Sequence, residues 1–331
     1  MRIFIKTLVL LVCCVAAIAA GGFTYLMLGY PKVGPAPDVT IERTSERIAR
    51  GKYLADHVAA CTDCHSQRDW ARYAGPVKDG TYGAGGEVFD ESMGMPGRVV
   101  SRNITPGALG DWTDGEILRA MTAGVSRDGS PLFPLMPYLD YGAHMDPEDA
   151  KAIVSYLRTI PASSHAPEPT RLNFPLPLIV RTMPQQPARV ATRPATDDRV
   201  AQGEYLVQMA GCTHCHTPMD DSRQPLPGRT LAGGTPFAFP NGVVARAANL
   251  TPHASGIGAW TEADFVQRFK SAAVEPQLVV AGGFNTPMPW QAYAGMTSDD
   301  LGAIYAYLRT LPAVDHAVEK VGYLQAGTAI P

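Results

Sequence analysis

One five-residue pattern, Cys-x-x-Cys-His, occurs twice in this chain and constrains its fold more than any other feature. The first copy is Cys61-Thr-Asp-Cys64-His65, and the second copy, Cys212-Thr-His-Cys215-His216, begins 151 residues later. The chain has six cysteines, and the other two, Cys13 and Cys14, lie in an apolar run near the N-terminus. No cysteine is left to join the two halves of the chain, so a scaffold of disulfide bonds is a poor interpretation.

Matching segments accompany the two motifs, in the same order, in both halves of the chain. Arg47–Leu54 corresponds to Arg199–Leu206, and Asn103–Pro106 corresponds to Asn249–Pro252. The further pairs are 111–113 with 259–261, 135–138 with 287–290, and 155–161 with 306–312. The offset between matching positions varies only from 146 to 152. The chain therefore contains a duplicated unit of about 115 residues, which is too long for the repeat of a solenoid.

The duplication and the length of 331 residues predict two domains. We expect a signal anchor or transmembrane helix at 1–30, a linker at 31–44, a first domain at 45–160, a proline-rich linker at 161–198, a second domain at 199–315 and a tail at 316–331. The second linker holds eight prolines, which favours an extended connector. Its apolar stretch, Leu172–Ile179, is expected to lie against a domain surface.

The local signals within each unit are mostly helical. A first helix is expected at about 45–60 and again at 198–211, each leading into a cysteine motif. Thr113-x-x-Glu116 forms a capping box that predicts the start of a middle helix, and Asp146 followed by Pro147 predicts the start of the last helix. Gly51 and Gly203 are expected to let the first helix cross closely over the last. Because strand signals are few and short, the sequence predicts an all-α fold with long loops.

The N-terminus carries no charge from Thr7 to Tyr30, which is long enough for a helix that crosses a bilayer. Ala17-Ile18-Ala19 could serve as the cleavage site of a secretory signal, but the apolar run continues to Leu28, so we favour an uncleaved anchor. Arg2 and Lys6 would keep the N-terminus in the cytoplasm. The expected location is the bacterial cytoplasmic membrane with the domains in the periplasm, and a cleaved, soluble periplasmic form is the alternative.

Cys-x-x-Cys-His is the signature of covalent haem c attachment. Two thiols at this spacing reach both vinyl groups on one porphyrin edge, and the next histidine then lies beneath the iron as proximal ligand. We therefore predict two covalently attached haem c groups, held by Cys61, Cys64 and His65 and by Cys212, Cys215 and His216. The rivals are a thioredoxin-like redox pair, which needs a βαβ context, and a zinc site, which needs further ligands that the two units do not share.

Met136 and Met288 are the expected distal iron ligands. They match across the repeat, each in a Met-Pro loop, and lie 72 and 73 residues beyond Cys64 and Cys215. His/Met ligation raises the potential of a haem and closes its iron to substrates. Core packing is the alternative role. Met95 is a rival ligand in the first unit, but its repeat partner is a phenylalanine, which cannot bind iron.

The remaining aromatic and histidine residues leave their roles open. Tyr53, Tyr205, Trp112 and Trp260 recur in the repeat, and they either border the haem or pack in the cores. The histidines outside the two motifs are expected to have surface or capping roles: His57, His144, His165, His214, His253 and His316. A net charge of −3 and a pI near 6.2 give no basic field, so nucleic acid is not an expected partner.

Taken together, residues 45–315 resemble tandem class I cytochrome c domains. They are most similar to the mono- and di-haem cytochrome c family that includes the cytochrome subunits of membrane-bound alcohol and aldehyde dehydrogenases. The best-known alcohol dehydrogenase subunits of that family carry three haem motifs, and this chain has two. The resemblance implies an electron-transfer protein rather than an enzyme. Its redox partner proteins would be a dehydrogenase or quinol-oxidising donor and an oxidase or soluble cytochrome acceptor. The alternative is a di-haem peroxidase or another haem oxidoreductase, which would need an iron that can open.

Overall fold

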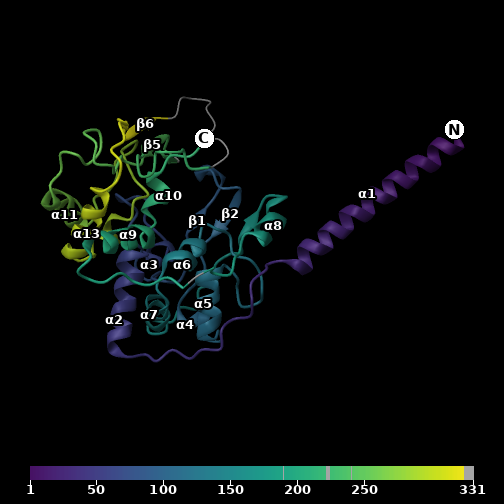
Figure 1. The fold of residues 1–331 in the computed structure, drawn as a ribbon, viewed down its shortest axis with the longest axis horizontal. Coiled ribbons are helices and arrows are strands. Elements are labelled where there is room, and N and C mark those ends of the chain that lie inside the picture. The colour runs from purple at the N-terminus through teal and green to yellow at the C-terminus, as the bar shows by residue number, and fades with distance from the viewer. Residues whose placement is uncertain (189, 221–223, 240, 324–331) are drawn as a thin grey trace.

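Residues 1–188, 190–220, 224–239 and 241–323 are described by the computed structural model of the chain. Helix α1 (Arg2–Gly29) leaves the rest of the molecule as a long rod with no buried residue (Figure 1). Its most apolar 18-residue window has a mean hydropathy of 2.7. The expected N-terminal apolar helix is therefore present, with the length and composition that a membrane span requires.

Five helices recur in the same order in the two halves of the remaining chain, and short additional helical turns differ between the halves. The first half contains α2 (Ser45–Tyr53), the π-helical turn η1 (Leu54–Val58), α3 (Cys61–Cys64), η2 (Glu91–Met93), α4 (Pro106–Leu109), α5 (Asp114–Ala123), α6 (Tyr138–His144) and α7 (Pro147–Leu157). The connector carries α8 (Leu176–Ile179) and η3 (Val180–Thr182). The second half contains α9 (Arg199–Met209), α10 (Cys212–His216), α11 (Glu262–Lys270), η4 (Ser271–Ala273), α12 (Trp290–Ala294) and α13 (Ser298–Leu308).

Capping residues fix the starts of the long helices. The Thr113 hydroxyl accepts from the Glu116 amide and the Glu116 carboxylate accepts from the Thr113 amide, which confirms the predicted capping box. Asp146 caps α7 with Pro147 in its first turn, also as predicted. Because each cap satisfies an amide that lacks a helical partner, the sequence sets these helix starts locally.

Two short antiparallel sheets stand beside the helices. The first has the order β1 (Val88–Phe89), β2 (Gly97–Val100) and β3 (Arg171–Leu172), and the second has β4 (Pro236–Ala238), β5 (Val243–Arg246) and β6 (Val321–Tyr323). The all-α expectation is therefore only partly right: the chain is rich in helix, but both halves carry a sheet. Strands of two to four residues are too short to show an alternating pattern in the sequence.

In each half, two long helices cross closely at a glycine. A Cβ on Gly51 would lie 1.8 Å from the Ala152 carbonyl oxygen, and a Cβ on Gly203 would lie 2.0 Å from that of Ala303. Helix α2 thus packs on α7, and α9 packs on α13. The expectation that these glycines let the first helix cross the last is confirmed.

Tyrosines from each half bind the last helix of the other half. Tyr205 of α9 donates to the Asp149 carboxylate of α7 at 2.7 Å, and its hydroxyl accepts from the Asp146 amide. Tyr53 of α2 donates in the same way to Asp300 of α13 and accepts from the Thr297 amide. The two halves are therefore joined by one contact that is made twice, in opposite directions.

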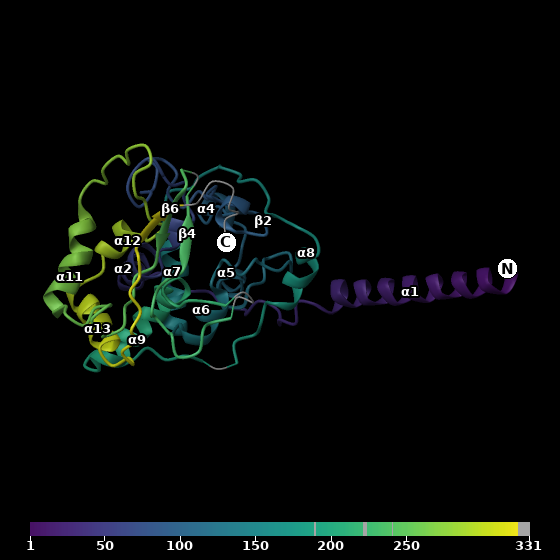
Figure 2. The same cartoon turned by 90° about the horizontal axis from the view of Figure 1, so that it is seen from above.

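Two histidines that were expected to have surface or capping roles also lie between the halves. His57 Nδ1 lies 3.0 Å from the Ala292 carbonyl oxygen, and His214 Nε2 lies 3.0 Å from an Asp140 carboxylate oxygen. The hydrogen bond to this carboxylate raises the pKa of His214. Helices α6 and α12, which supply these partners, thus help to join the two halves (Figure 2).

Candidate functional site

All the side chains predicted to hold the two haems line one cavity. Its volume is about 1370 Å³, which exceeds the roughly 300–1,000 Å³ of an ordinary small-molecule site. The predicted residues in its wall are Cys61, Cys64, His65, Met136, Cys212, Cys215, His216 and Met288. The structure therefore brings together residues that are up to 227 positions apart in the sequence.

Each cysteine pair lies on a short helix that starts from a left-handed residue. Ala60 has φ 48° before α3, and Gly211 has φ 65° before α10. Cysteines three positions apart on a helix lie on one face, so both thiols of a pair reach the same side of the cavity.

Both motif histidines are held in one orientation by a backbone carbonyl. His65 Nδ1 lies 2.7 Å from the Arg102 carbonyl oxygen, and His216 Nδ1 lies 2.7 Å from that of Ala248. A carbonyl oxygen only accepts, so Nδ1 carries the proton and Nε2 keeps its lone pair. Burial also lowers the pKa of both histidines. Each ring is thus in the neutral form that ligates a metal.

The cysteine pairs lack the chemistry of a thioredoxin-like motif. Burial raises the pKa of Cys61 and Cys212 to about 12, and that of Cys64 and Cys215 to about 11. A redox-active pair needs a lowered thiol pKa, so the direction of these shifts disfavours this rival. For the zinc rival, the described residues contain no group of three or more His, Cys, Asp or Glu that could hold a metal ion, so the structure gives it no support.

Met136 and Met288 enter the cavity from equivalent turns. The amides of Tyr138 and Trp290 donate to the carbonyl oxygens of Met136 and Met288, each at 2.8 Å, just as α6 and α12 begin. Four other methionines also line the cavity: Met121, Met209 and Met296, which are buried in the core, and Met93 of η2, which is partly exposed. Met95, the rival ligand, is not in the cavity wall.

The recurring aromatic residues separate into two groups. Trp112 and Trp260 line the cavity and also pack against the core, so both open interpretations hold for them. Tyr205 lies in the core and Tyr53 packs against it, as the packing interpretation predicts, and their hydroxyls also bind carboxylates of the opposite half. Their repetition in the sequence marked them as important, but their partners lie in the other repeat and could not be identified locally.

Two further matched pairs were missed by sequence reasoning. Tyr141 and Tyr293 line the cavity, and their hydroxyls donate to the carbonyl oxygens of Ala59 and Ala210, just before the cysteine motifs. His165 and His316 form a second pair. Their backbone carbonyl oxygens accept hydrogen bonds from the side-chain amides of Asn103 and Asn249, respectively. Offsets of 152 and 151 could have revealed both pairs.

The wall of the cavity and its donor atoms both suit a haem group. Beside the cysteines and histidines, its lining includes apolar side chains that both halves contribute to the hydrophobic core, such as Ile117, Leu157, Phe265 and Leu308. Mostly apolar walls with a few fixed polar groups are typical of cofactor sites. A thioether donor, an imidazole and paired thiols are the groups that a c-type haem uses.

The paired cysteines, the histidines and the methionines in this cavity fit a covalently attached haem. Residues 200–312 match the family model described as cytochrome c, so this part of the chain is similar to cytochrome c domains. The family resemblance seen in the sequence is confirmed.

Known relatives carry related names. The fructose dehydrogenase cytochrome subunit of Gluconobacter japonicus is 30% identical over 305 residues, which are 88% of this chain and 58% of that protein. The alcohol dehydrogenase (quinone) cytochrome c subunit of Gluconacetobacter polyoxogenes is 30% identical, with coverage of 85% and 59%. A diheme cytochrome c-type protein of Cereibacter sphaeroides is 28% identical, with coverage of 77% and 83%.

This chain spans less than two thirds of the two dehydrogenase subunits. All three relatives are named as cytochromes or cytochrome subunits rather than as catalytic subunits. The comparisons therefore agree with the expected electron-transfer cytochrome that binds haem c covalently.

Proposed function

We propose that this chain is a membrane-anchored di-haem cytochrome c that relays electrons in the periplasm. Residues 45–160 and 199–315 are the two cytochrome c domains of this proposal. His65 and His216 are the proximal iron ligands, Met136 and Met288 are the distal ones, and two cysteines anchor each haem. Bound in this way, the haems would supply two redox-active irons.

The observation that carries the proposal is the shared cavity. One continuous wall holds both cysteine pairs, both histidines and both methionines. The chain's own residues orient the two imidazoles through backbone carbonyls and surround both sites with apolar side chains. Such surroundings exclude water and favour a high potential.

The donor we propose is a dehydrogenase, and the acceptor is a terminal oxidase or a soluble cytochrome. Support for the donor comes from relatives named as cytochrome subunits of fructose and alcohol dehydrogenases, and of gluconate 2-dehydrogenase in Pantoea cypripedii. Helix α1 would hold the chain at the membrane, and Arg2 and Lys6 at its start favour an N-terminus in the cytoplasm.

Purification of the tagged full chain from its native membranes tests the proposal. We expect a dehydrogenase to purify with the chain, and the substrate of that dehydrogenase to reduce both haems. Absence of any dehydrogenase, with no reduction of the haems by dehydrogenase substrates in the membranes, would contradict the donor.

Ligand binding separates the carrier from the peroxidase alternative. With a methionine at each iron, cyanide and hydrogen peroxide should leave the absorption spectrum unchanged on the time scale of mixing. Rapid binding of either molecule at one iron would favour a haem oxidoreductase instead.

A further inference from the structure

We propose that residues 174–179, here named the interface segment, lie in the headgroup region of the bilayer beside the end of α1. In this position they would hold the first half of the chain against the membrane surface. The inference rests on the proposed anchoring by α1 (Arg2–Gly29). It goes further because it assigns a second membrane contact to the connector between the two halves.

Arg181 fixes the segment to the end of α1. Its guanidinium donates to the carbonyl oxygens of Leu26 at 3.1 Å, Met27 at 2.9 Å and Tyr30 at 2.6 Å. The last carbonyls of a helix have no helical partner, and α1 has no basic residue in its own last turn. Arg181 therefore supplies the cation that the end of α1 lacks, although it is more than 150 residues away in the sequence.

The same contacts set the depth of the segment. A helix needs about 20 residues, at 1.5 Å each, to cross a hydrocarbon core of about 30 Å. The 20 residues that follow Lys6 end at Leu26. The carbonyls that Arg181 binds would thus lie at the outer boundary of the hydrocarbon. Tyr25 and Tyr30 pack edge to face there, at 5.8 Å between ring centroids, and tyrosines are enriched at this level.

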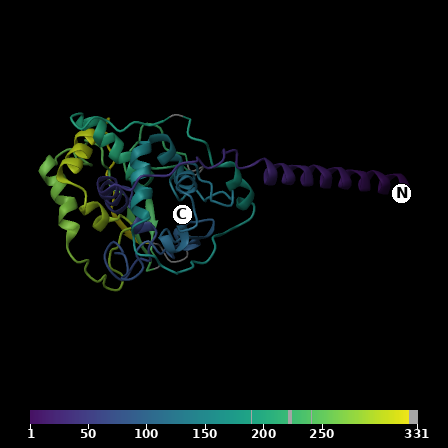
Figure 3. The same cartoon turned by 90° about the horizontal axis from the view of Figure 1, so that it is seen from below.

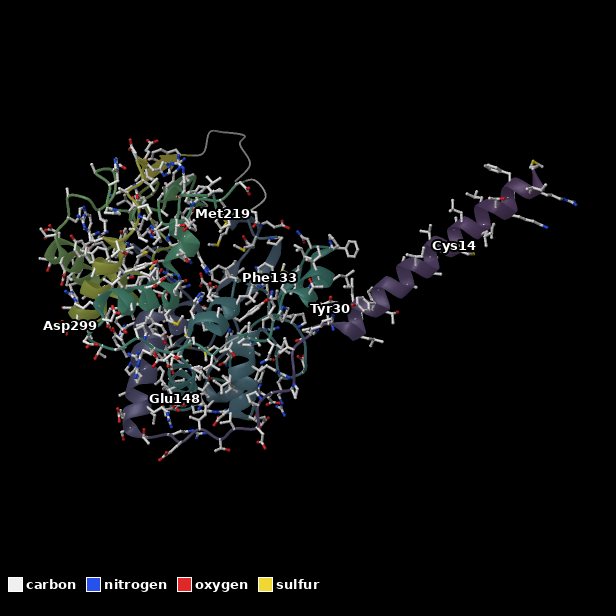
Figure 4. All side chains as sticks on the ribbon, viewed as in Figure 1. Cys14, Tyr30, Phe133, Glu148, Met219 and Asp299 are labelled. Carbon is white, nitrogen blue, oxygen red and sulfur yellow. The ribbon has the colours of Figure 1, made fainter. Side chains whose placement is uncertain are left out.

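The interface segment exposes apolar side chains next to this boundary. Phe174 is 82% exposed and Ile179 is 44% exposed, while Leu176 and Leu178 are partly exposed. Helix α8 lies beside the end of α1 in Figures 1 and 3, and Figure 4 places Tyr30 between α1 and the rest of the molecule. Apolar side chains with a nearby arginine suit a lipid surface, where the chains enter the acyl boundary and the charge stays at the headgroups.

Photocrosslinking of the full chain in lipid nanodiscs tests the proposal. Benzoylphenylalanine would replace Phe174 in one variant, Ile18 of α1 in a second and Val280 in a third. Ile18 is 76% exposed and Val280 is 75% exposed. Val280 belongs to the loop that joins η4 to α12, and Figure 2 shows this yellow-green loop on the side of the molecule away from α1. After illumination, mass spectrometry should find lipid adducts at positions 174 and 18 and none at 280.

The outcomes separate this proposal from the anchor itself. Lipid adducts at 18 without adducts at 174 would overturn the interface segment and leave the anchor in place. No adduct at 18 would overturn the anchor. In native membranes, a protein adduct in place of a lipid adduct at 174 would show that a partner subunit covers the segment, which would also overturn the proposal.

Arg181 gives a second test. Arg181→Ala should lower the yield of lipid adducts at position 174 several-fold while the haem spectrum stays unchanged, and Arg181→Lys should restore part of it. Arg171→Ala, which removes an exposed arginine of the same connector, should leave the yield unchanged. An undiminished yield in Arg181→Ala would overturn the positioning role of Arg181.

Discussion

The Tyr205 hydroxyl donates a 2.7 Å hydrogen bond to the Asp149 carboxylate across the contact between the two halves of the chain. Asp149 is 1% exposed and also pairs with Arg50 at 2.7 Å and Arg193 at 3.1 Å. Burial raises the pKa of Tyr205, so the phenol remains a donor at neutral pH. Tyr53 repeats the contact with Asp300, and the two together hold both halves around the shared cavity.

Tyr205→Phe should therefore destabilise the chain. A hydrogen bond to a charged group contributes about 1.5–3 kcal/mol, and the loss should appear as a lower free energy of unfolding in guanidinium, followed by haem absorbance and circular dichroism. Tyr323→Phe, at a tyrosine that is 71% exposed, is the matched control and should change little. Equal stability of the two variants would show that the contact does not join the halves.

Gly203→Ala should disrupt the crossing of α9 and α13. The added Cβ would lie 2.0 Å from the Ala303 carbonyl oxygen and 2.8 Å from Tyr307 Cβ, and backbone atoms cannot move aside cheaply. We expect a loss of stability at or above the upper end of the usual 1–3 kcal/mol, roughly, for overpacking. Gly34→Ala is the control, because its added Cβ would lie 3.7 Å from the nearest atom, Gln186 Oε1. Thermal unfolding should show this variant to be at least as stable as the unchanged protein.

Arg158 is expected to contribute far more to stability than its repeat partner Arg309. Arg158 binds Asp114 through Nε at 3.1 Å and Nη2 at 3.0 Å, and both side chains are at most 10% exposed. Arg158→Met would leave the buried Asp114 carboxylate with weaker partners, which should lower the free energy of unfolding by about 3–5 kcal/mol.

Arg309 is exposed and donates to the Gly258 carbonyl oxygen at 3.1 Å. Arg309→Met should therefore lower the free energy of unfolding by less than about 1 kcal/mol. Urea unfolding of the two variants side by side measures the difference, and similar losses would refute the role of the Arg158–Asp114 pair.

Met136→Ala and Met288→Ala test the distal ligands. Each substitution should leave haem attached, because the cysteines still hold it, while the potential of that haem falls and its iron binds cyanide. Spectroelectrochemistry and a cyanide titration measure both effects. Met219→Ala, at a methionine that is 46% exposed, should behave like the unchanged protein. An unchanged spectrum in either ligand variant would remove that methionine from the assignment.

Local chemistry made much of the fold predictable from the sequence. The capping box at Thr113 and the Asp146-Pro147 pair act within one helical turn, so their signals are complete in the sequence. The crossing glycines could be identified because each repeats beside the same helix pattern. The cysteine motifs carry their chemistry in five adjacent residues.

Contacts between distant segments were not predictable in the same way. Strands β3 and β6 form only because 171–172 and 321–323 reach β2 and β5. The connector was expected to lie against a domain surface, which is right for Leu172 in β3 and wrong for Phe174, which is exposed. The partners of Tyr53 and Tyr205 are 247 and 56 residues away, so only the three-dimensional arrangement reveals them.

The mass of the intact chain purified from membranes tests the central claim most directly. Two covalently bound haems predict that the measured mass exceeds that of the polypeptide by two haem groups. A variant with Cys212→Ala and Cys215→Ala should lose one of these groups, and so should a variant with Cys61→Ala and Cys64→Ala. A single haem in the unchanged protein, or the loss of both haems from either variant together with a folded circular dichroism spectrum, would contradict two independent attachment sites.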